Sequence, residues 1–200
     1  MGRARRFDER LLLDCAQEAF WTHGYERTSI EMVSRASGVG NGSIYAAYGS
    51  KLGLFLAVFE RYCAGRVALV DGAVAARVAS FEEAVARYLE VIVADCTSRA
   101  DRRGCLMLNS IVELGERYPD VVAVAERTIS SMEDAWAERI RRAGVDGELR
   151  IDPDEVEPLA AHIVLVSQGL IQLSRAGSSE DKLRRIAETA GRLSVAGHAA

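Results

Sequence analysis

The chain has 200 residues, of which 49% are hydrophobic, and a formal net charge of −4 at pH 7. This is enough apolar material for a sizeable core, in one domain or in a small domain joined to a larger one, and it excludes a disordered chain. The apolar stretches fall short of the roughly 20 residues of a membrane span, and the start MGRARRFDER lacks an apolar signal core, so we expect a soluble cytoplasmic protein with no membrane partner.

Charge is unevenly distributed along the chain. Residues 1–51 hold seven basic and six acidic side chains, whereas residues 52–200 hold eighteen and twenty-three. Arg3, Arg5 and Arg6 precede the first helical pattern. Such a basic arm would suit a nucleic-acid backbone, although charge alone favours a solvated terminus without a binding role.

The cysteines give no sign of a metal or disulfide framework. Cys15, Cys63, Cys96 and Cys105 are widely spaced, with no CxxC pair and no nearby histidine. We therefore expect reduced thiols, no metal site and no cofactor.

Apolar residues recur at helical spacing in every long segment, and alternating strand-like runs are absent, which predicts an all-α fold. Gly24 would end the first helix, and Thr28 with Glu31 has the spacing of a capping box for the second. The inward face of this second helix would be Ile30, Val33 and Ala36. The first three of about nine expected helices cover about residues 8–23, 28–38 and 41–48, and Ser50 would cap a longer fourth helix that carries Leu54 to Tyr62. Ser80 with Glu83 forms a capping box for the helix over 84–97. The others cover about 105–116, 119–142, 152–175 and, from Ser178 or Ser179, the last segment.

The stretch GVGNGSIYAAYGSK, residues 38–51, is rich in glycine but fits neither phosphate-binding loop. A dinucleotide loop needs GxGxxG after a strand, and a P-loop needs Gly-Lys-Ser/Thr. A helix, a short turn and a second short helix instead predict a helix-turn-helix, whose second helix enters the major groove of DNA. Gly38 would be left-handed, Val39 would plug the bend, and Ile44 would point inward from residues 41–48.

Residues 24–55, GYERTSIEMVSRASGVGNGSIYAAYGSKLGLF, resemble the DNA-binding domain of the TetR family of bacterial transcription regulators. The shared features are a Gly-Tyr-x-x-Thr-Ser entry at 24–29, a Gly-Val bend at 38–39, Gly-x-Ile-Tyr at 42–45 and Lys51. Chain length and helix count also agree. The resemblance implies a homodimeric repressor that a small-molecule effector releases from a palindromic operator in double-stranded DNA.

The resemblance also implies a set of DNA contacts. Thr28, Tyr45 and Lys51 would contact phosphates, while Asn41, Ser43 and their neighbours would contact bases; the two tyrosines of the helix could instead be core aromatics. The expected DNA-binding residues are Arg3, Arg5, Arg6, Thr28, Ser29, Asn41, Gly42, Ser43, Tyr45, Ala46, Ala47, Tyr48 and Lys51.

Four positions depart from residues that are frequent in the family: Glu31, Gly40, Asn41 and Ala47. The operator sequence is therefore not implied by the resemblance. Fewer cations also predict fewer neutralised phosphates and a shallower salt dependence of binding.

We expect a helix-turn-helix domain over residues 1–52, with the arm at 1–7, and a helical ligand-binding and dimerisation domain over 53–200. The last two helices carry apolar stripes that would form a four-helix dimer interface, the alternative being a core within one protomer. The stripe residues are Leu159, Ile163, Val166, Leu170, Leu173, Leu183, Ile186, Ala190 and Leu193.

Polar or aromatic residues on otherwise apolar helices are candidates for the effector site, although each is individually more typical of a core or surface position. They are Tyr62, Arg66, Tyr88, Cys105, Asn109, Glu113, Trp136 and His162. Asn109 and Glu113 are the better pair because they lie four residues apart on one helix face.

GCLMLNSIVEL, residues 104–114, resembles a Gly-Cys-Leu-x-x-Asn pattern of one branch of TetR-like regulators. Cys105 lies near a helix N-terminus and follows Arg102 and Arg103, features that lower a thiol pKa and would suit a sensor of electrophiles. A small buried apolar role is the alternative.

Two other classes of protein are alternatives to a transcription regulator. An enzyme with Cys105 as nucleophile and His162 as base would need an orienting group and an oxyanion site, for which the sequence has no signature, so we expect no enzyme. A helical ligand-binding or cysteine-based electrophile-sensing protein with weak or lost DNA binding is the other alternative.

Overall fold

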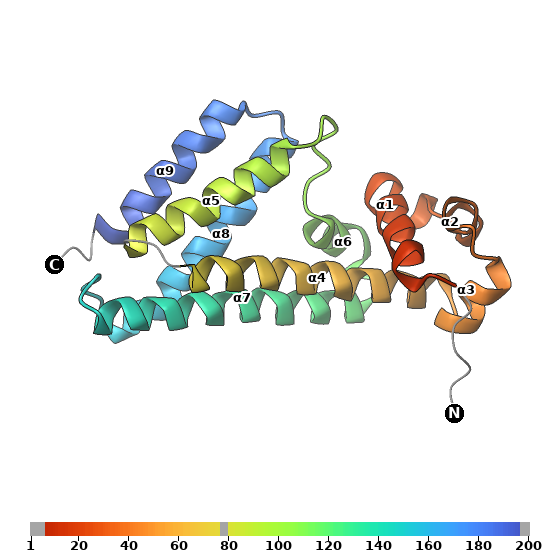
Figure 1. Ribbon diagram of the computed structural model, residues 1–200, viewed down its shortest axis with the longest axis horizontal. Coiled ribbons are helices and arrows are strands. Elements are labelled where there is room, and N and C mark those ends of the chain that lie inside the picture. Colours follow the sequence, from red (N-terminus) through yellow and green to blue (C-terminus); the bar gives the residue numbers. More distant parts are fainter. Residues whose placement is uncertain (1–6, 77–79, 197–200) are drawn as a thin grey trace. The chain divides into compact units, whose positions relative to one another are not determined.

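The computed structural model describes residues 7–76 and 80–196, and the regular structure of those residues is helical, which confirms the all-α prediction. Nine α helices occur in the described ranges, with one short 3-10 helix, η1 (Figure 1). Their bounds are α1 Glu9–Arg27, α2 Ile30–Ser37, α3 Asn41–Tyr48, α4 Lys51–Ala75, α5 Phe81–Thr97, α6 Leu106–Leu114, α7 Pro119–Val145, η1 Pro153–Glu155, α8 Val156–Arg175 and α9 Glu180–Ala196.

The chain divides into two compact units. Unit 1 comprises the described residues up to Ala64 together with Leu106–Ala125, and unit 2 comprises Gly65–Cys105 with the described residues from Glu126 onward. Helices α4 and α7 each contribute to both units. This division follows packing and differs from the expected functional boundary between residues 52 and 53, which stays a prediction.

In unit 1, α1 begins where the backbone N–H of Leu11 donates to the Asp8 carboxylate at 3.0 Å. Gly24 interrupts the helix as expected, since its φ of 77° and ψ of 170° are not helical. The core of this unit is aromatic: the Phe55 ring lies 5.2 Å from the rings of both Phe20 and Tyr25, measured between centroids.

Helix α2 differs from its prediction at both ends. Its cap is Ser29 and not Thr28, because the Ser29 hydroxyl accepts from the backbone N–H of Met32 at 3.1 Å. Its buried residue in the last turn is Ser37 and not Ala36, which is exposed. Residue 37 lies four positions after Val33, on the same face, and the Ser37 hydroxyl donates to the Val33 carbonyl at 2.8 Å.

In unit 2, α5 packs against α8 and α9 (Figure 1). The predicted cap is confirmed, because the Ser80 hydroxyl accepts from the Glu83 N–H at 3.2 Å. Trp136 of α7 is fully buried and meets the rings of Phe81 and Tyr88 with centroid separations of 6.3 and 5.3 Å. These large aromatics fill the core of the unit.

The stretch Pro153–Arg175 is long and apolar enough to cross a membrane by length and composition alone. In the structure it consists of η1 and α8, and α8 packs against α5 and α9. Eight residues of α8 are buried within unit 2, as a core helix of a globular unit requires.

Candidate nucleic-acid interface and ligand pocket

Helices α2 and α3 form the predicted helix-turn-helix. Gly38 ends α2 in the left-handed conformation, with φ 72° and ψ 6°, which confirms its expected role. Val39 is 8% exposed, and Ile44, the buried residue of α3, is fully enclosed. These two apolar side chains anchor the turn and α3 to the core of unit 1.

The rest of α3 is mostly open to solvent. Asn41, Gly42, Ser43, Tyr45 and Ala46 are exposed, and the Tyr45 side chain retains 50% of its accessible surface. Helical spacing places Asn41 in line with Tyr45, and Gly42 in line with Ala46. We call these five residues the α3 outer face. Its exposure fits groove contact, although the base and phosphate roles of its members stay predictions.

Lys51, at the start of α4, is held in a defined position. Its Nζ donates to the Glu26 carbonyl at 3.2 Å and lies 4.2 Å from the centroid of the Tyr25 ring. Burial, followed by the hydrogen bond with Tyr118, raises the pKa of Tyr25 to about 12, so the ring stays neutral. An ammonium group has three N–H donors, and Lys51 therefore has donors left for a phosphate.

Two residues of the expected DNA-binding set, Thr28 and Tyr48, have other partners in the structure. Thr28 is 1% exposed, and its hydroxyl lies 2.7 Å from the Gly24 carbonyl and 3.1 Å from that of Ala19. A buried hydroxyl requires a hydrogen-bond partner, and these two carbonyl contacts stabilise the turn between α1 and α2. The Tyr48 hydroxyl donates to the Glu9 carboxylate at 2.9 Å and thereby joins α3 to α1.

Ser29 and Ala47 are placed differently from those two residues. Ser29 is exposed as the cap of α2, and Ala47 is partly exposed on α3. The expected contacts of Arg3, Arg5 and Arg6 lie outside the described residues.

Glu113 of α6 has a structural role that sequence reasoning missed. Its carboxylate accepts from the backbone N–H groups of Tyr25 and Glu26, at 3.1 and 3.2 Å. It also fills the space beside Gly24, since a Cβ on that glycine would lie 2.9 Å from a Glu113 oxygen. We call this contact the Glu113 clamp. It holds the end of α1 within unit 1, so the structure places Glu113 here and not in a ligand site of unit 2.

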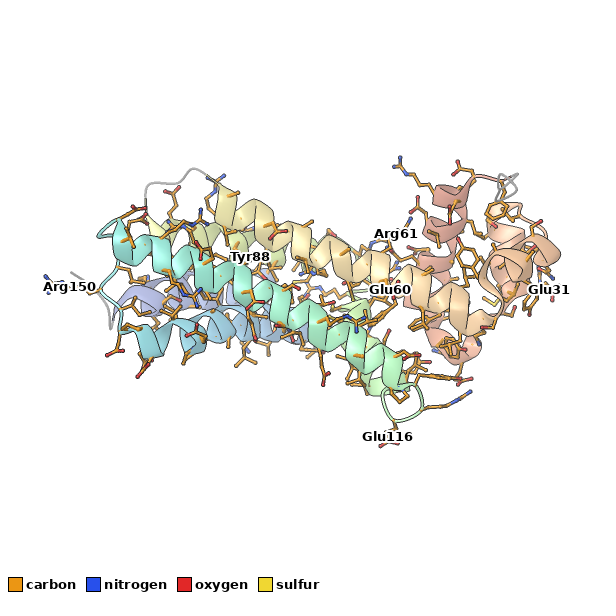
Figure 2. All side chains as sticks on the ribbon, turned by 90° about the horizontal axis from the view of Figure 1, so that it is seen from below. Glu31, Glu60, Arg61, Tyr88, Glu116 and Arg150 are labelled. Carbon is orange, nitrogen blue, oxygen red and sulfur yellow. The ribbon has the colours of Figure 1, made fainter. Side chains whose placement is uncertain are left out.

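Most cations around the helix-turn-helix are paired. Arg35 forms an ion pair with Glu31 at 3.2 Å, on the outer part of α2 where Glu31 is exposed (Figure 2). Arg61 of α4 meets Asp14 of α1 at 2.6 Å. Both arginines therefore have part of their charge balanced within unit 1.

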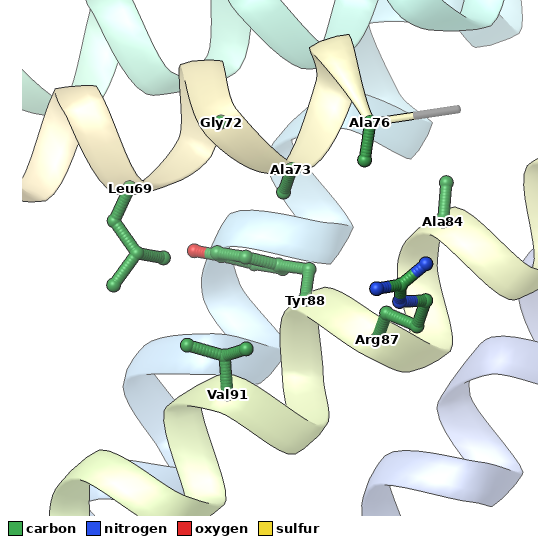
Figure 3. Close-up of a pocket in the computed structure, with 8 residues that line it drawn as sticks. All are labelled: Leu69, Gly72, Ala73, Ala76, Ala84, Arg87, Tyr88 and Val91. Atoms are coloured by element: carbon green, nitrogen blue, oxygen red, sulfur yellow. The ribbon is translucent and has the colours of Figure 1, made fainter. Parts of the chain in front are cut away.

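A cavity of about 210 Å³ opens between the last turns of α4 and the first half of α5 (Figure 3). It is lined by Leu69, Gly72, Ala73, Ala76, Ala84, Arg87, Tyr88 and Val91. Seven of these residues are aliphatic, aromatic or glycine, and Arg87 has the charged side chain. The ring of Tyr88 crosses the space between the two helices. We call this cavity the α4–α5 pocket.

Tyr88 links the pocket to the interior of unit 2. Burial raises its pKa, while a hydrogen bond with Ser167 and the positive charge of Arg66 act in the opposite direction. Arg66 has a side chain that is 12% exposed and forms an ion pair with Asp95 at 3.1 Å. The structure therefore brings four of the expected ligand-site residues together in one region of unit 2: Tyr88, Arg66, Cys105 and Trp136.

The other expected ligand residues lie elsewhere. Tyr62 packs edge-on against Trp21 in unit 1, with ring centroids 5.2 Å apart. Asn109 is also in unit 1, on α6. His162 is exposed and lines a different surface, formed by α8 and α9. Sequence spacing could not distinguish these locations, because it contains no information on which helices pack together.

Cys105 is 3% exposed, in agreement with the alternative of a buried apolar residue. The two arginines that precede it have partners of their own: Arg102 donates to the Ser178 carbonyl, and Arg103 pairs with Asp101 at 3.1 Å. The other thiol of this unit, Cys96, is half-buried, and burial raises its pKa. These features favour unreactive thiols, and the sensor role stays a prediction.

Helices α8 and α9 form an open groove of about 420 Å³ on the outside of unit 2. The groove is lined by His162, Val166, Lys182, Arg185, Ile186, Thr189, Ala190 and Leu193. Leu159 and Leu173 are partly exposed on α8, and Leu193 is 63% exposed on α9. We call this surface the α8–α9 groove.

Four residues of the expected dimer stripe are buried within the protomer. Ile163 and Leu170 are each 1% exposed, Leu183 is fully buried, and Ala190 is 8% exposed although it also lines the α8–α9 groove. Each of these helices must face inward as well as outward, so its apolar residues divide between two faces. The sequence pattern did not separate those two faces, and the role of these helices in the dimer stays a prediction.

Comparison with known proteins gives matches over almost the whole chain. Residues 12–58 match the family described as "Bacterial regulatory proteins, tetR family", and residues 76–190 match "Tetracyclin repressor-like, C-terminal domain". The chain is 32% identical over 192 residues to the HTH-type transcriptional repressor ComR of Escherichia coli (strain K12), covering 96% of this chain and 91% of that relative.

Solved structures agree. A cysteine mutant of the TetR family transcriptional regulator CifR, complexed with 26-base-pair double-strand operator DNA, is 31% identical, with a TM-score of 0.79 and coverage of 95% of this chain and 98% of that one. A regulator from Mesorhizobium loti has a TM-score of 0.80 at 16% identity, over 96% of each chain, which shows a shared fold.

Proposed function

The chain belongs to the TetR family of bacterial regulatory proteins and is a DNA-binding transcription regulator, and from this we propose that it is a homodimeric repressor that a small-molecule effector releases from a palindromic operator. The observation that carries the proposal is the exposed α3 outer face, mounted on a helix-turn-helix whose Gly38 is left-handed. Helices of this type place their N-terminal residues against base edges in the major groove.

Phosphate contacts would flank the groove. Tyr45 presents an exposed side chain from α3, and Lys51 presents a fixed ammonium group from the start of α4. Such contacts set the register of the protein on DNA without reading its sequence. Asn41 and Ser43 are left to meet the bases.

Dimerisation would use the α8–α9 groove. Its apolar residues, Val166, Ile186 and Leu193, remain accessible in one chain, and a second copy would cover them by a two-fold arrangement of four helices. Dimerisation would also let two α3 helices reach half-sites about 34 Å apart.

The α4–α5 pocket is the proposed effector site. Its apolar lining with one arginine suits a small, mainly apolar molecule that has an anionic or hydrogen-bond-accepting group. The effector would favour a protein conformation in which the two recognition helices no longer match successive grooves. Within the DNA-binding unit, the Glu113 clamp would couple a movement of α6 to the end of α1, because the Glu113 carboxylate is bonded to the backbone there.

We place the protein in the cytoplasm, where its DNA is, and we assign it no enzymatic activity. Cys105 is buried, whereas His162 is exposed on the outer side of α8, so the two do not present a nucleophile and a base at one open site.

Selection of the purified protein on random duplex DNA, followed by salt titration of the enriched sequence, tests the proposal. We expect a palindrome with half-site centres about ten base pairs or more apart. Protein that has been unfolded and refolded serves as a control, because it has lost any co-purified effector. Absence of enrichment at low salt with the refolded protein would overturn the proposal.

A further inference from the structure

Helix α3, NGSIYAAY, has no charged residue, although it is the helix that would enter the groove. Arginine and lysine are the usual readers of guanine, through its O6 and N7 acceptors. Asparagine instead pairs with adenine, by accepting from N6 and donating to N7. The composition of α3 therefore bears directly on which base pair it recognises.

Asn41 is the residue of α3 best suited to such a contact. It is the first residue of the helix and is exposed, and its side-chain amide makes no hydrogen bond within residues 7–76 and 80–196. Ser43 donates or accepts with any base and so discriminates poorly. The Tyr45 ring lies one turn beyond Asn41, where the DNA backbone would run.

Gly42 allows the helix to approach closely. A Cβ built on Gly42 would meet nothing within 4 Å, and its φ lies outside the positive range, so the fold itself does not need glycine there. Glycine inside a helix costs roughly 0.5–1 kcal/mol relative to alanine. A close approach brings the short Asn41 side chain within reach of a base edge.

Two cations of the described part of this unit, Lys51 and Arg35, already have partners. Lys51 is held by the Glu26 carbonyl and the Tyr25 ring, and Arg35 on α2 is paired with Glu31. Both suit phosphates better than a base below α3.

We propose that each α3 helix reads an A·T base pair, with the Asn41 amide bidentate to adenine. This inference rests on the proposed function and adds the class of operator base that the helix recognises.

The test uses the selected operator with single-atom changes in its bases. Substituting 7-deazaadenine for the contacted adenine removes the N7 acceptor. We expect this change to weaken binding by the wild-type protein at least about fivefold. The Asn41→Ala protein should bind the unmodified operator roughly 5- to 150-fold more weakly and be indifferent to 7-deazaadenine.

Asn41→Arg sharpens the test, because arginine prefers guanine. Selection with this variant should replace the adenine of the half-site with guanine, a gain of binding that a misfolded protein would not show. An enriched half-site with G·C beneath α3, or an unchanged base preference in Asn41→Ala, would overturn the inference while the proposed function stands. Failure of the wild-type protein to bind any sequence would overturn the proposed function itself.

Discussion

Both compact units have an aromatic core, but unit 1 also uses polar groups to hold the end of a helix. In unit 1, the end of α1 is held by polar groups that bond to its backbone: the Glu113 carboxylate, the Thr28 hydroxyl and the Lys51 ammonium group. In unit 2, the aromatic rings of Phe81, Tyr88 and Trp136 and the buried faces of α5 and α8 pack together.

Their exposed surfaces differ in the same sense. The α3 outer face is polar and has small side chains, whereas the α8–α9 groove exposes Val166, Ile186 and Leu193. Polar, hydrated edges suit the bases and phosphates of DNA. Exposed apolar side chains suit an interface that excludes water. This difference supports the proposal that the α3 outer face binds DNA and the α8–α9 groove binds a second copy of the chain.

The largest expected effect comes from a charge in the α8–α9 groove. Val166→Arg would have to bury a guanidinium group beside Lys182 and Arg185, and both the desolvation and the like-charge repulsion oppose dimerisation. We expect monomers in analytical ultracentrifugation. Operator affinity should fall about 100-fold or more, because binding two half-sites together depends on the dimer.

Val145→Arg is the matched control for that variant. Val145 ends α7, is 87% exposed and is not among the residues that line the groove. It should leave both the dimer and the operator affinity unchanged. A dimer that persists in Val166→Arg would refute the assignment of this surface.

Removing the Glu113 clamp should have the next largest effect. Glu113→Ala leaves the N–H groups of Tyr25 and Glu26 without their acceptor and should lower the free energy of unfolding by about 1 kcal/mol. If DNA binding requires the end of α1 to become ordered again, the binding free energy decreases by the same amount and operator affinity falls about fivefold. Chemical denaturation and a fluorescence titration measure the two quantities.

Glu116→Ala provides the comparison, since Glu116 is an exposed glutamate in the loop after α6 (Figure 2). We expect it to behave as the wild type. Equal effects of the two variants would mean that loss of negative charge, and not loss of the clamp, is responsible.

Gly42→Ala should separate stability from DNA binding. Because an added Cβ has free space in the unbound protein, the variant should be more stable by roughly 0.5–1 kcal/mol. The same methyl group would stand between α3 and the base edges, so operator affinity should fall. Gly144→Ala in α7, where a Cβ would make ordinary contacts at 3.7 Å, should leave DNA binding intact. Unweakened binding by Gly42→Ala would exclude a close approach at that position.

The smallest expected effect is on alkaline stability. The folded-state pKa of Tyr25 is raised from 10.0 to about 12, mainly by burial, so the folded state keeps a proton that the unfolded state loses. This contribution is fully present below about pH 10 and is lost as pH rises toward 12. Tyr25→Phe has no such proton, and its free energy of unfolding should decline less over that range. Parallel curves for the two proteins in chemical denaturation would contradict the assignment.

Local signals in the sequence were sufficient for most helix boundaries. Ser80 and Gly38 act where capping chemistry placed them, because a cap concerns only the few residues around it. The shift from Thr28 to Ser29 shows the limit of this reasoning. Adjacent hydroxyl residues compete for the cap, and burial of Thr28 against α1 decided the outcome.

The candidate sites divide in the same way. The α3 outer face could be predicted from helical periodicity. Once Ile44 is known to be buried, helical spacing determines which of the other residues of this eight-residue helix face outward. The effector-site residues could not be predicted in this way. Tyr62, Glu113 and Tyr88 all lie on apolar helical segments of the sequence, but they have different neighbours in the folded protein.

The sequence by itself determined an all-helical chain, the helix-turn-helix and its family, because these depend on residue spacing and on motifs within a few turns. Tertiary structure decided that Glu113 holds α1, that Ile163 and Leu170 belong to the protomer core, and that a pocket opens beside Tyr88. The physical reason is that an amphipathic pattern specifies which side of a helix is apolar, whereas burial of that side depends on neighbours distant in the chain.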